Sequence, residues 1–582
     1  MANILGLDPD DQFPSAGDQG AYSAHRGRET PCTAGANRAG GAHLRAVPNK
    51  SNKSNQPNRA IQHMTGIVQQ NNSCSLLTGA AAPVSGPGVP AGLATARNRE
   101  RGSVLVIVLW IAFGLVALAL YFAQSAYTEY RAADNYVAGI EAEQAIEGAL
   151  RYLTNLLATV QTNSASLPDL LSYQQAAVQV GNAMFWVIGR NTNMLQTGPD
   201  YPSFGLVDES SKLNLNTATA AMLECLPRMT PDLAANIVTW RDASQTNLEV
   251  GVPPEIYLHF IPPYRCKQAP FETVEELRLV YGMTNFVLYG EDMNMNGVLE
   301  FNENDGDANA PPDNADGRLD PGLFEYLTIW SREPNTALDG TQRIDVTSTN
   351  AQADLATLLQ QRFGTTRANE ILLNVGLGGG QQNQQGGGRG QGGQQGQPGG
   401  QPAQQPAPRP SFGSLLEFYL ISGMTEDEFA QVSDYIAITN VSYMTGLVNV
   451  NTASEAVLAC VPGIGSNMAP ALVSYRISNP ASLRSVAWIA NVLDRQSAIQ
   501  AGPYITSRSY QYTADIAAVG HYGRGFRRVK FVIDMCDGTP KVLYRQDLTR
   551  LGWPLGPQIR KALQLVSGTD PATAARILGT VR

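Results

Sequence analysis

The residues with the clearest metal-binding chemistry lie in the short segment Asp292–Glu303, DMNMNGVLEFNE. The segment fits the pattern D-x-[DN]-x-[DN]-G-x5-E of a calcium loop at every position. Gly297 permits the sharp turn that this loop needs, and Leu299 would pack inward. The alternative is an acidic, solvated loop. The pattern predicts a Ca²⁺ site whose ligands are the side chains of Asp292, Asn294, Asn296 and Glu303, the backbone carbonyl of Val298, and Glu300 through a water.

An acidic stretch follows this loop and extends the candidate metal region to 292–320. Carboxylates crowded together repel one another, and a second cation would relieve that repulsion. Their spacing fits no known template, so the sequence only suggests a second site. Its candidate ligands are Asp305, Asp307, Asp313, Asp316 and Asp320.

Catalytic groups do not cluster in the sequence. Beyond residue 102 the only histidines are His259 and His521, which lie far apart. The chain contains no GxSxG, HExxH or P-loop motif. The cysteines beyond residue 102 are widely spaced and form no CxxC pair, which argues against a zinc site. These observations predict a protein that is not an enzyme.

Charge is distributed unevenly along the 582 residues. The formal net charge of −9 divides into +4 for residues 1–102 and −13 for the remainder. An acidic body disfavours the phosphate attraction that dominates nucleic-acid binding. We therefore expect no nucleic-acid partner.

One segment has the length and composition of a membrane span. Residues 102–128 carry no charge, and 104–122 are almost wholly apolar, which is enough for a helix across a bilayer. A cleaved secretory signal would have a shorter apolar core. Three arginines precede the run, so the positive-inside rule places the N-terminus in the cytoplasm and the rest outside. These residues are Arg97, Arg99 and Arg101.

Short β-prone segments flank a long helical region. They predict one sheet whose strands come from both ends of the exported part, interrupted by a helical insert at 211–500. The expected fold class is therefore α+β. The predicted strands are 183–189, 203–208, 509–519, 527–534 and 541–545.

The helical region contains internal repeats. Residues 213–227 return as 448–462, with an offset that stays constant through Arg241 and Arg476. A degenerate third copy begins at 344–350. A second motif, FxSxxEL-like, follows each copy, which predicts up to three helical units. Its instances are 271–277, 412–418 and a weaker 482–488.

Two repeat copies resemble helix-hairpin-helix motifs. Thr217 and Thr452 are candidate N-caps, and Pro462-Gly-Ile-Gly465 would form the glycine turn. In DNA-binding members such a turn offers N–H groups to phosphates. Here the first copy has Arg228-Met-Thr230 instead, and few basic residues follow either turn. The sequence favours a packing role over DNA binding.

The junction before the apolar run resembles a prepilin peptidase site, with cleavage between Gly102 and Ser103. Most pilins carry Glu at the fifth mature position, where this chain has Ile107. With the split sheet, the NxNTA units and the calcium loop, this departure resembles the minor pseudopilin K family of type II secretion systems. The resemblance implies a pilin-like antiparallel sheet interrupted by a SAM-like domain, and bound calcium. It also implies a place at the pseudopilus tip with minor pseudopilins of the I and J type, beside the major pseudopilin.

The predicted organisation places a single-pass protein in the inner membrane, with its bulk in the periplasm. Two other functions remain compatible with the sequence, a competence-type DNA receptor and a minor type IV pilin. The predicted parts are a disordered leader at 1–102, the transmembrane and pilin-type helix at 103–160, sheet segments at 161–210 and 501–550, the insert at 211–500 and a tail at 551–582. A Gly/Gln/Pro linker at 376–410 would loop out between the second and third units.

Overall fold

The computed structural model describes residues 103–161, 177–190, 202–245, 250–348, 351–377 and 411–566, with residues 573 and 576. The predicted leader 1–102, including Gly102, lies outside these residues, as does nearly all of the predicted linker. Ser103 is the first residue of helix α1, Ser103–Gln161. Among the described residues, this is the one helix long and apolar enough to cross a membrane.

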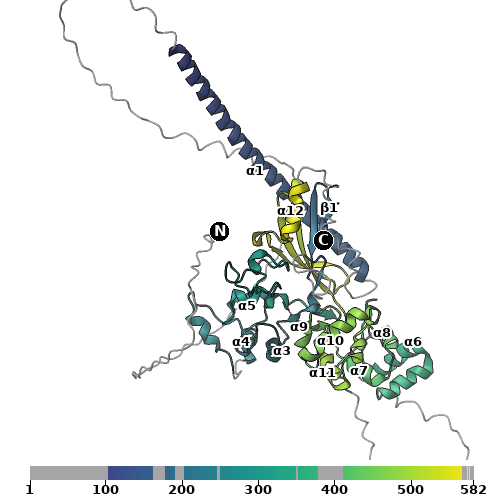
Figure 1. The fold of residues 1–582 in the computed structure, drawn as a ribbon. Coiled ribbons are helices and arrows are strands. Elements are labelled where there is room, and N and C mark those ends of the chain that lie inside the picture. The colour runs from purple at the N-terminus through teal and green to yellow at the C-terminus, as the bar shows by residue number, and fades with distance from the viewer. Residues whose placement is uncertain are drawn as a thin grey trace, which may run out of the picture. The chain divides into compact units, whose positions relative to one another are not determined.

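The first part of helix α1 stands apart from the other elements, and its second part lies beside the sheet (Figure 1). Its first part is exposed throughout, whereas from Ala138 an apolar stripe of small and branched residues is buried against the sheet. The stripe recurs every three or four residues, the spacing of one helical face. This face consists of Ala142, Ala145, Ile146, Ala149, Leu153 and Leu157.

Six strands form one antiparallel sheet in the order β1-β2-β12-β13-β14, with β3 also pairing with β12. Strands β2 and β12, which flank the insert, pair directly, with Val187 opposite Ile516. The mixed fold is confirmed. Each predicted strand segment contains an observed strand, but 203–208 forms one only at Val207–Asp208. The strands are β1 Val178–Val180, β2 Ala183–Ile188, β3 Val207–Asp208, β12 Gln511–Val519, β13 Arg527–Asp534 and β14 Lys541–Asp547.

Residues assigned by sequence to a tail include helix α12, Gly556–Val566, which packs on the sheet face opposite α1. Its Ile559 and Leu563 contact the core that contains Trp186 and Val519. Because alternate residues of a strand point to opposite faces, β2 and β12 contribute to both cores. Both faces of these strands are therefore covered.

The insert between β3 and β12 contains three units, and each is framed by a short parallel strand pair. Leu213 pairs with Leu327, Ile344 with Ile436, and Val448 with Ile505. The paired strands are β4 Leu213–Asn214 with β5 Leu327–Thr328, β7 Ile344–Asp345 with β8 Ile436–Ala437, and β10 Val448–Asn449 with β11 Ile505–Thr506. The degenerate third repeat is thus confirmed as a unit of the same construction.

Each unit carries its own helices. The first has α3 Ala220–Glu224, α4 Pro231–Arg241 and α5 Asn285–Tyr289. The second has α6 Ala351–Asn374, broken at Gly364, with α7 Leu415–Ser422 and α8 Glu426–Val432. The third has α9 Glu455–Ala459, α10 Gly465–Ser478 and α11 Arg495–Ala501. Strands β6 Arg332–Pro334 and β9 Tyr443–Thr445 pair between units.

Short 3₁₀ turns complete the connections. They are η1 Glu209–Ser211, η2 Ala243–Gln245, η3 Pro254–His259, η4 Val274–Leu279, η5 Phe301–Glu303, η6 Leu323–Glu325, η7 Pro480–Ser482, η8 Val486–Asn491, η9 Gly502–Tyr504, η10 His521–Gly523 and η11 Thr549–Leu551.

Residues shared by the first and third units explain why the same strand-and-turn arrangement forms in both. The side chain of Asn214 accepts a hydrogen bond from the N–H of Asn216 at 2.9 Å, and Asn449 does the same for Asn451. Such Asx turns reverse the chain directly after the short strand. Arg241 then donates to the carbonyls of residues 215 and 218, as Arg476 does to those of Val450 and Ala453.

The predicted place of the Gly/Gln linker is wrong. The segment falls within the second unit, because β7 before it pairs with β8 after it. The same unit has one core, in which Leu355 and Ile371 lie with Phe418 and Phe429. The FxSxxEL-like motif at 412–418 therefore belongs to the second unit, and the apparent boundary was a break in composition rather than in packing.

Candidate metal loop and its surroundings

The candidate calcium loop begins three residues after the end of α5 and ends in η5, Phe301–Glu303. The carboxylate of Asp292 accepts hydrogen bonds from the N–H groups of Asn296 and Gly297, both at 2.8 Å. The side chain of Asn296 accepts one from Val298 N–H at 2.8 Å. These bonds wind the backbone around the side-chain oxygens. Gly297 has a φ of 68°, a conformation open to glycine, as the pattern requires.

The end of the loop folds back on itself. Glu303 accepts a hydrogen bond from Glu300 N–H at 3.0 Å, and Glu300 accepts one from the Asn296 amide at 3.2 Å. Leu299 is buried, which confirms its predicted inward packing. The structure thus brings Asp292, Asn296, Glu300 and Glu303 into one hydrogen-bonded loop.

Three acidic groups of this loop have pKa values above their ordinary values. Burial, and then the nearby Asp292 carboxylate, raise the pKa of Glu303 to about 8. Burial also raises the pKa of Asp292 and Glu300. Among the described residues, Glu303 forms no ion pair with a basic side chain. A cation among these groups would favour their charged forms, so the donor set fits Ca²⁺.

The acidic stretch beyond the loop uses its carboxylates differently. Asp313 accepts hydrogen bonds from the N–H groups of Asp305, Gly306 and Ala315. Asp316 caps Arg318 N–H, while Asp307 is exposed. Asp320 lies 3.7 Å from Arg228.

Within the described ranges, no group of three or more His, Cys, Asp or Glu side chains lies close enough to hold a metal ion by itself. A cation at 292–303 would therefore also need amide or backbone oxygens, as the predicted ligand set includes. The second site remains a prediction without a gathered ligand set.

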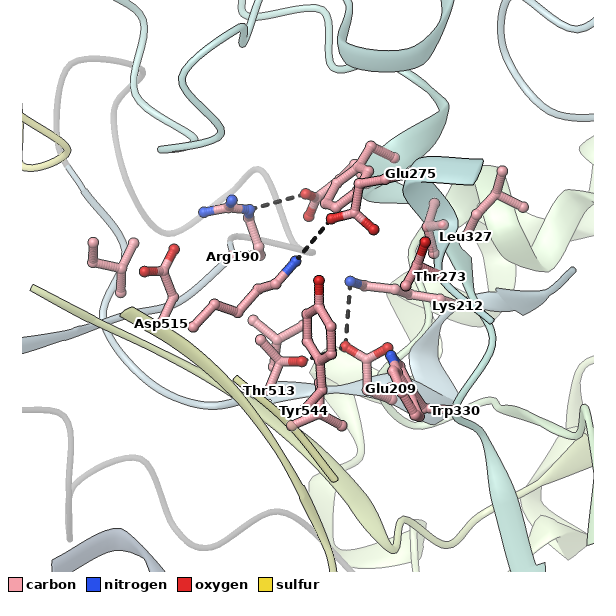
Figure 2. A pocket seen from close by; sticks show the side chains of 17 residues that line it. Arg190, Glu209, Lys212, Thr273, Glu275, Leu327, Trp330, Thr513, Asp515 and Tyr544 are labelled. Atoms are coloured by element: carbon pink, nitrogen blue, oxygen red, sulfur yellow. Dashed lines mark hydrogen bonds and ion pairs between the residues drawn. The ribbon is translucent and has the colours of Figure 1, made fainter. Parts of the chain in front are cut away.

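The first helical unit meets the sheet across a charged cavity of about 60 Å³, shown in Figure 2. Lys530 of β13 lies 3.8 Å from Glu275, and Arg190 lies 2.9 Å from Glu325. Lys212 and Thr513 both contact Glu209. A cavity of this size has room for water and not for an organic substrate. The junction therefore combines ion pairs with apolar and aromatic side chains.

One glycine of the third unit's turn, Gly463, is packed against α11, whereas Gly465 of the same turn has open space beside it. A Cβ atom added at Gly463 would lie 2.4 Å from the carbonyl oxygen of Ser497 and 2.9 Å from Ala501 N, both in α11. Arg476, the basic residue of the following helix, is buried and bonded to the unit's own carbonyls. The side of the hairpin that carries Gly463 and Arg476 thus packs inside the protein.

Sequence reasoning missed several residues that position the loop and the units. Arg241 and Arg476 have equivalent roles, and their constant offset in the repeat was the signal that could have revealed them. Arg190 and Arg528 donate to carbonyls of the metal loop across more than a hundred residues, and no local pattern marks them.

Comparison with known proteins identifies two segments. Residues 210–288 match the family model for the type II secretion system (T2SS), protein K. Residues 445–490 match the model of the helix-hairpin-helix motif. No curated protein matches the chain.

Among solved structures, a chain of the GspK-GspI-GspJ complex from the enterotoxigenic Escherichia coli type 2 secretion system is similar at 13% identity, with a TM-score of 0.28. The similarity covers 70% of this chain and 97% of that chain. At this TM-score it carries no weight for fold or function.

Proposed function

We propose that this chain, whose likeness to type II secretion system protein K is confirmed by the family match at residues 210–288, acts as a minor pseudopilin. In that role it is a structural component of the pseudopilus tip and supports protein export across the outer membrane. The family match carries this proposal. It coincides with the first part of the first helical unit, where the NxNTA strand, α3, α4 and the FxSxxEL-like turn meet.

The long helix supports a membrane-anchored assembly role. The apolar run 104–122 anchors the protein in the inner membrane with a cytoplasmic N-terminus, and prepilin peptidase cleaves after Gly102. Beyond this run, Tyr127, Tyr130 and Tyr136 are exposed on α1. These side chains are available to neighbouring helices of the I-type, J-type and major pseudopilins. The covered sheet then serves as the pilin-like body in the periplasm.

Calcium is the proposed cofactor. The residues that would hold it are Asp292, Asn294, Asn296, the Val298 carbonyl, Glu300 and Glu303. When bound, the ion would offset the repulsion among buried carboxylates and fix the loop. The raised pKa of Glu303 supports this proposal, because it shows that the charged form of this buried carboxylate lacks a positive partner, which a cation would supply.

A second candidate is a membrane-tethered DNA receptor, which the helix-hairpin-helix match at 445–490 favours. Three observations weigh against it: the packed turn at Gly463, the internally bonded Arg476 and the net charge of −13 beyond residue 102. A minor type IV pilin would share the anchor and the sheet but would assemble with a different set of partners.

The test is co-purification of the full-length chain from detergent-solubilised membranes. We expect the I-type and J-type minor pseudopilins of the same organism to be retained. A version with the substitution Tyr130→Arg on the exposed face of α1 should retain less of them. The matched control Glu129→Arg changes a neighbouring exposed position.

Retention of type IV pilus components instead would favour the pilin alternative. Micromolar binding to duplex DNA at physiological salt, with a steep salt dependence, would favour the receptor.

A further inference from the structure

The candidate metal loop is held from outside by two arginines of the sheet region. Arg528 of β13 donates from Nη1 to the carbonyl of Asn294 at 2.7 Å and from Nη2 to that of Met295 at 2.5 Å. Arg190, two residues after β2, also donates to the Met295 carbonyl at 2.5 Å. One carbonyl of the loop therefore accepts hydrogen bonds from two guanidinium groups.

Arg528 is fixed before it reaches the loop. Its side chain is fully buried and bonds both carboxylate oxygens of Asp515 in β12, at 3.0 and 2.6 Å. This two-point contact orients the planar guanidinium, and the carboxylate compensates its charge. Arg190 is likewise paired with Glu325. Each arginine thus has a carboxylate partner outside the loop while it donates to the loop carbonyls.

The backbone bound in this way is the part that most needs support. Met295 has a φ of 54°, in the left-handed region that side chains other than glycine rarely adopt. On its other side, Asp292 holds the N–H groups of Asn296 and Gly297. The turned conformation is therefore fixed between a carboxylate of the loop and two arginines from the sheet region.

We infer that Arg190 and Arg528 are positioning residues for the metal loop, and that they couple cation binding at 292–303 to the docking of the helical insert on the sheet. This inference rests on the proposed calcium binding. The neighbouring cavity is lined by ion pairs as well as apolar side chains, so directional contacts help to define this junction. Closing the loop around a cation presents the 294 and 295 carbonyls to the arginines, and ordered arginines favour the closed loop.

Hydrogen-exchange mass spectrometry on the full-length protein in detergent tests this coupling, with chelator and then rising calcium. In the unmutated protein, we expect calcium to slow exchange in peptides covering 292–303 and, at the same midpoint, in peptides covering β12 and β13. The variant Arg528→Lys keeps a positive charge opposite Asp515 but lacks the planar guanidinium group that bonds Asp515 and the loop carbonyls at the same time. Its calcium midpoint should rise about ten-fold, the effect of one charge-assisted hydrogen bond.

Arg332→Lys is the matched control. Arg332 also joins the insert to the sheet, through Asp534, and does not contact the loop. Its midpoint should stay within about two-fold of the unmutated value, because lysine keeps a positive charge opposite Asp534 and the change removes no hydrogen bond to the loop. If Arg528→Lys does not fold, Arg190→Lys supplies the comparison, since Arg190 is less buried.

The outcomes separate three claims. A calcium-protected loop whose midpoint is the same in Arg528→Lys and in Arg332→Lys overturns the positioning role and leaves calcium binding intact. Protection of the loop without any response of β12 and β13 overturns the coupling. An unmutated loop that is indifferent to millimolar calcium overturns calcium binding itself, and the inference with it.

Discussion

The contacts that the sheet makes with α1 and with the insert differ in the side chains that form them. Against α1 the sheet presents apolar side chains such as Phe185, Ile516 and Phe531 in one continuous core. Towards the insert it presents the charged side chains of Asp208, Asp515, Arg528 and Lys530, beside one aromatic contact between Tyr544 and Trp330. Burial of apolar area is strong and non-directional, whereas buried ion pairs stabilise little but require exact partners. The first contact provides stability, and the second fixes which partners meet and in which register.

The strongest way to break this comparison is to open a cavity in the apolar contact. Phe531 is buried in β13 beneath α1. We expect Phe531→Ala to lower the free energy of unfolding by about 4 kcal/mol, because apolar burial is lost and a cavity remains. Chemical unfolding of the full-length protein in detergent measures the change.

Val542→Ala on β14 is the control for Phe531→Ala, since Val542 is 45% exposed. A loss at Phe531 no larger than the loss at Val542 would mean that α1 does not pack on this face.

The polar contact can be broken at Asp208 of β3. Its carboxylate accepts hydrogen bonds from Asn449, Thr452 and Ser509, which ties the sheet to the third unit. Burial raises the pKa of Asp208 to about 6, against the effect of these donors. Asp208→Ala would leave the donors buried without an acceptor and should lower the free energy of unfolding by about 3 kcal/mol.

Asp208→Asn, measured in the same unfolding experiment, should cost less than Asp208→Ala because it keeps one acceptor oxygen. Equal losses in the two variants would indicate that volume rather than hydrogen bonding matters at this site.

The smallest expected effect concerns a polar clamp beside the apolar contact. His521 bonds Glu141 at 2.7 Å and Asp134 at 3.0 Å, while Arg524 also pairs with Asp134. Burial would lower the pKa of His521, but its two carboxylate partners outweigh burial and raise that pKa. A raised folded-state pKa contributes stability that is complete below the ordinary value near 6.5 and is lost as the pH rises through the folded value.

We therefore expect the melting temperature to fall more between about pH 6 and pH 8 in the unmutated protein than in His521→Gln. The corresponding difference in the free energy of unfolding should be about 1 kcal/mol or less, as for a partly exposed ion pair. The scan is differential calorimetry at several pH values. Parallel pH profiles in the two proteins would remove His521 from the account of this clamp.

The sequence by itself determined the apolar helix, the strands on either side of the insert, the repeat frame and the metal-loop pattern. Each of these is written in a local signal: an uninterrupted apolar run, a period of two, a recurring Asn-x-Asn turn, or a spaced set of oxygen donors around Gly297. Such signals survive because secondary structure and tight turns depend on near neighbours. The family likeness at 210–288 followed from the same local motifs.

Only the tertiary structure decided how these pieces meet. It joined the residues before and after the Gly/Gln segment into one unit, through the pairing of Ile344 with Ile436. It turned Gly463 towards α11, and it brought Arg190 and Arg528 onto the carbonyl of Met295. These contacts join residues up to 233 positions apart. No pattern within one segment encodes them, because the two segments of each contact come together only in the folded protein.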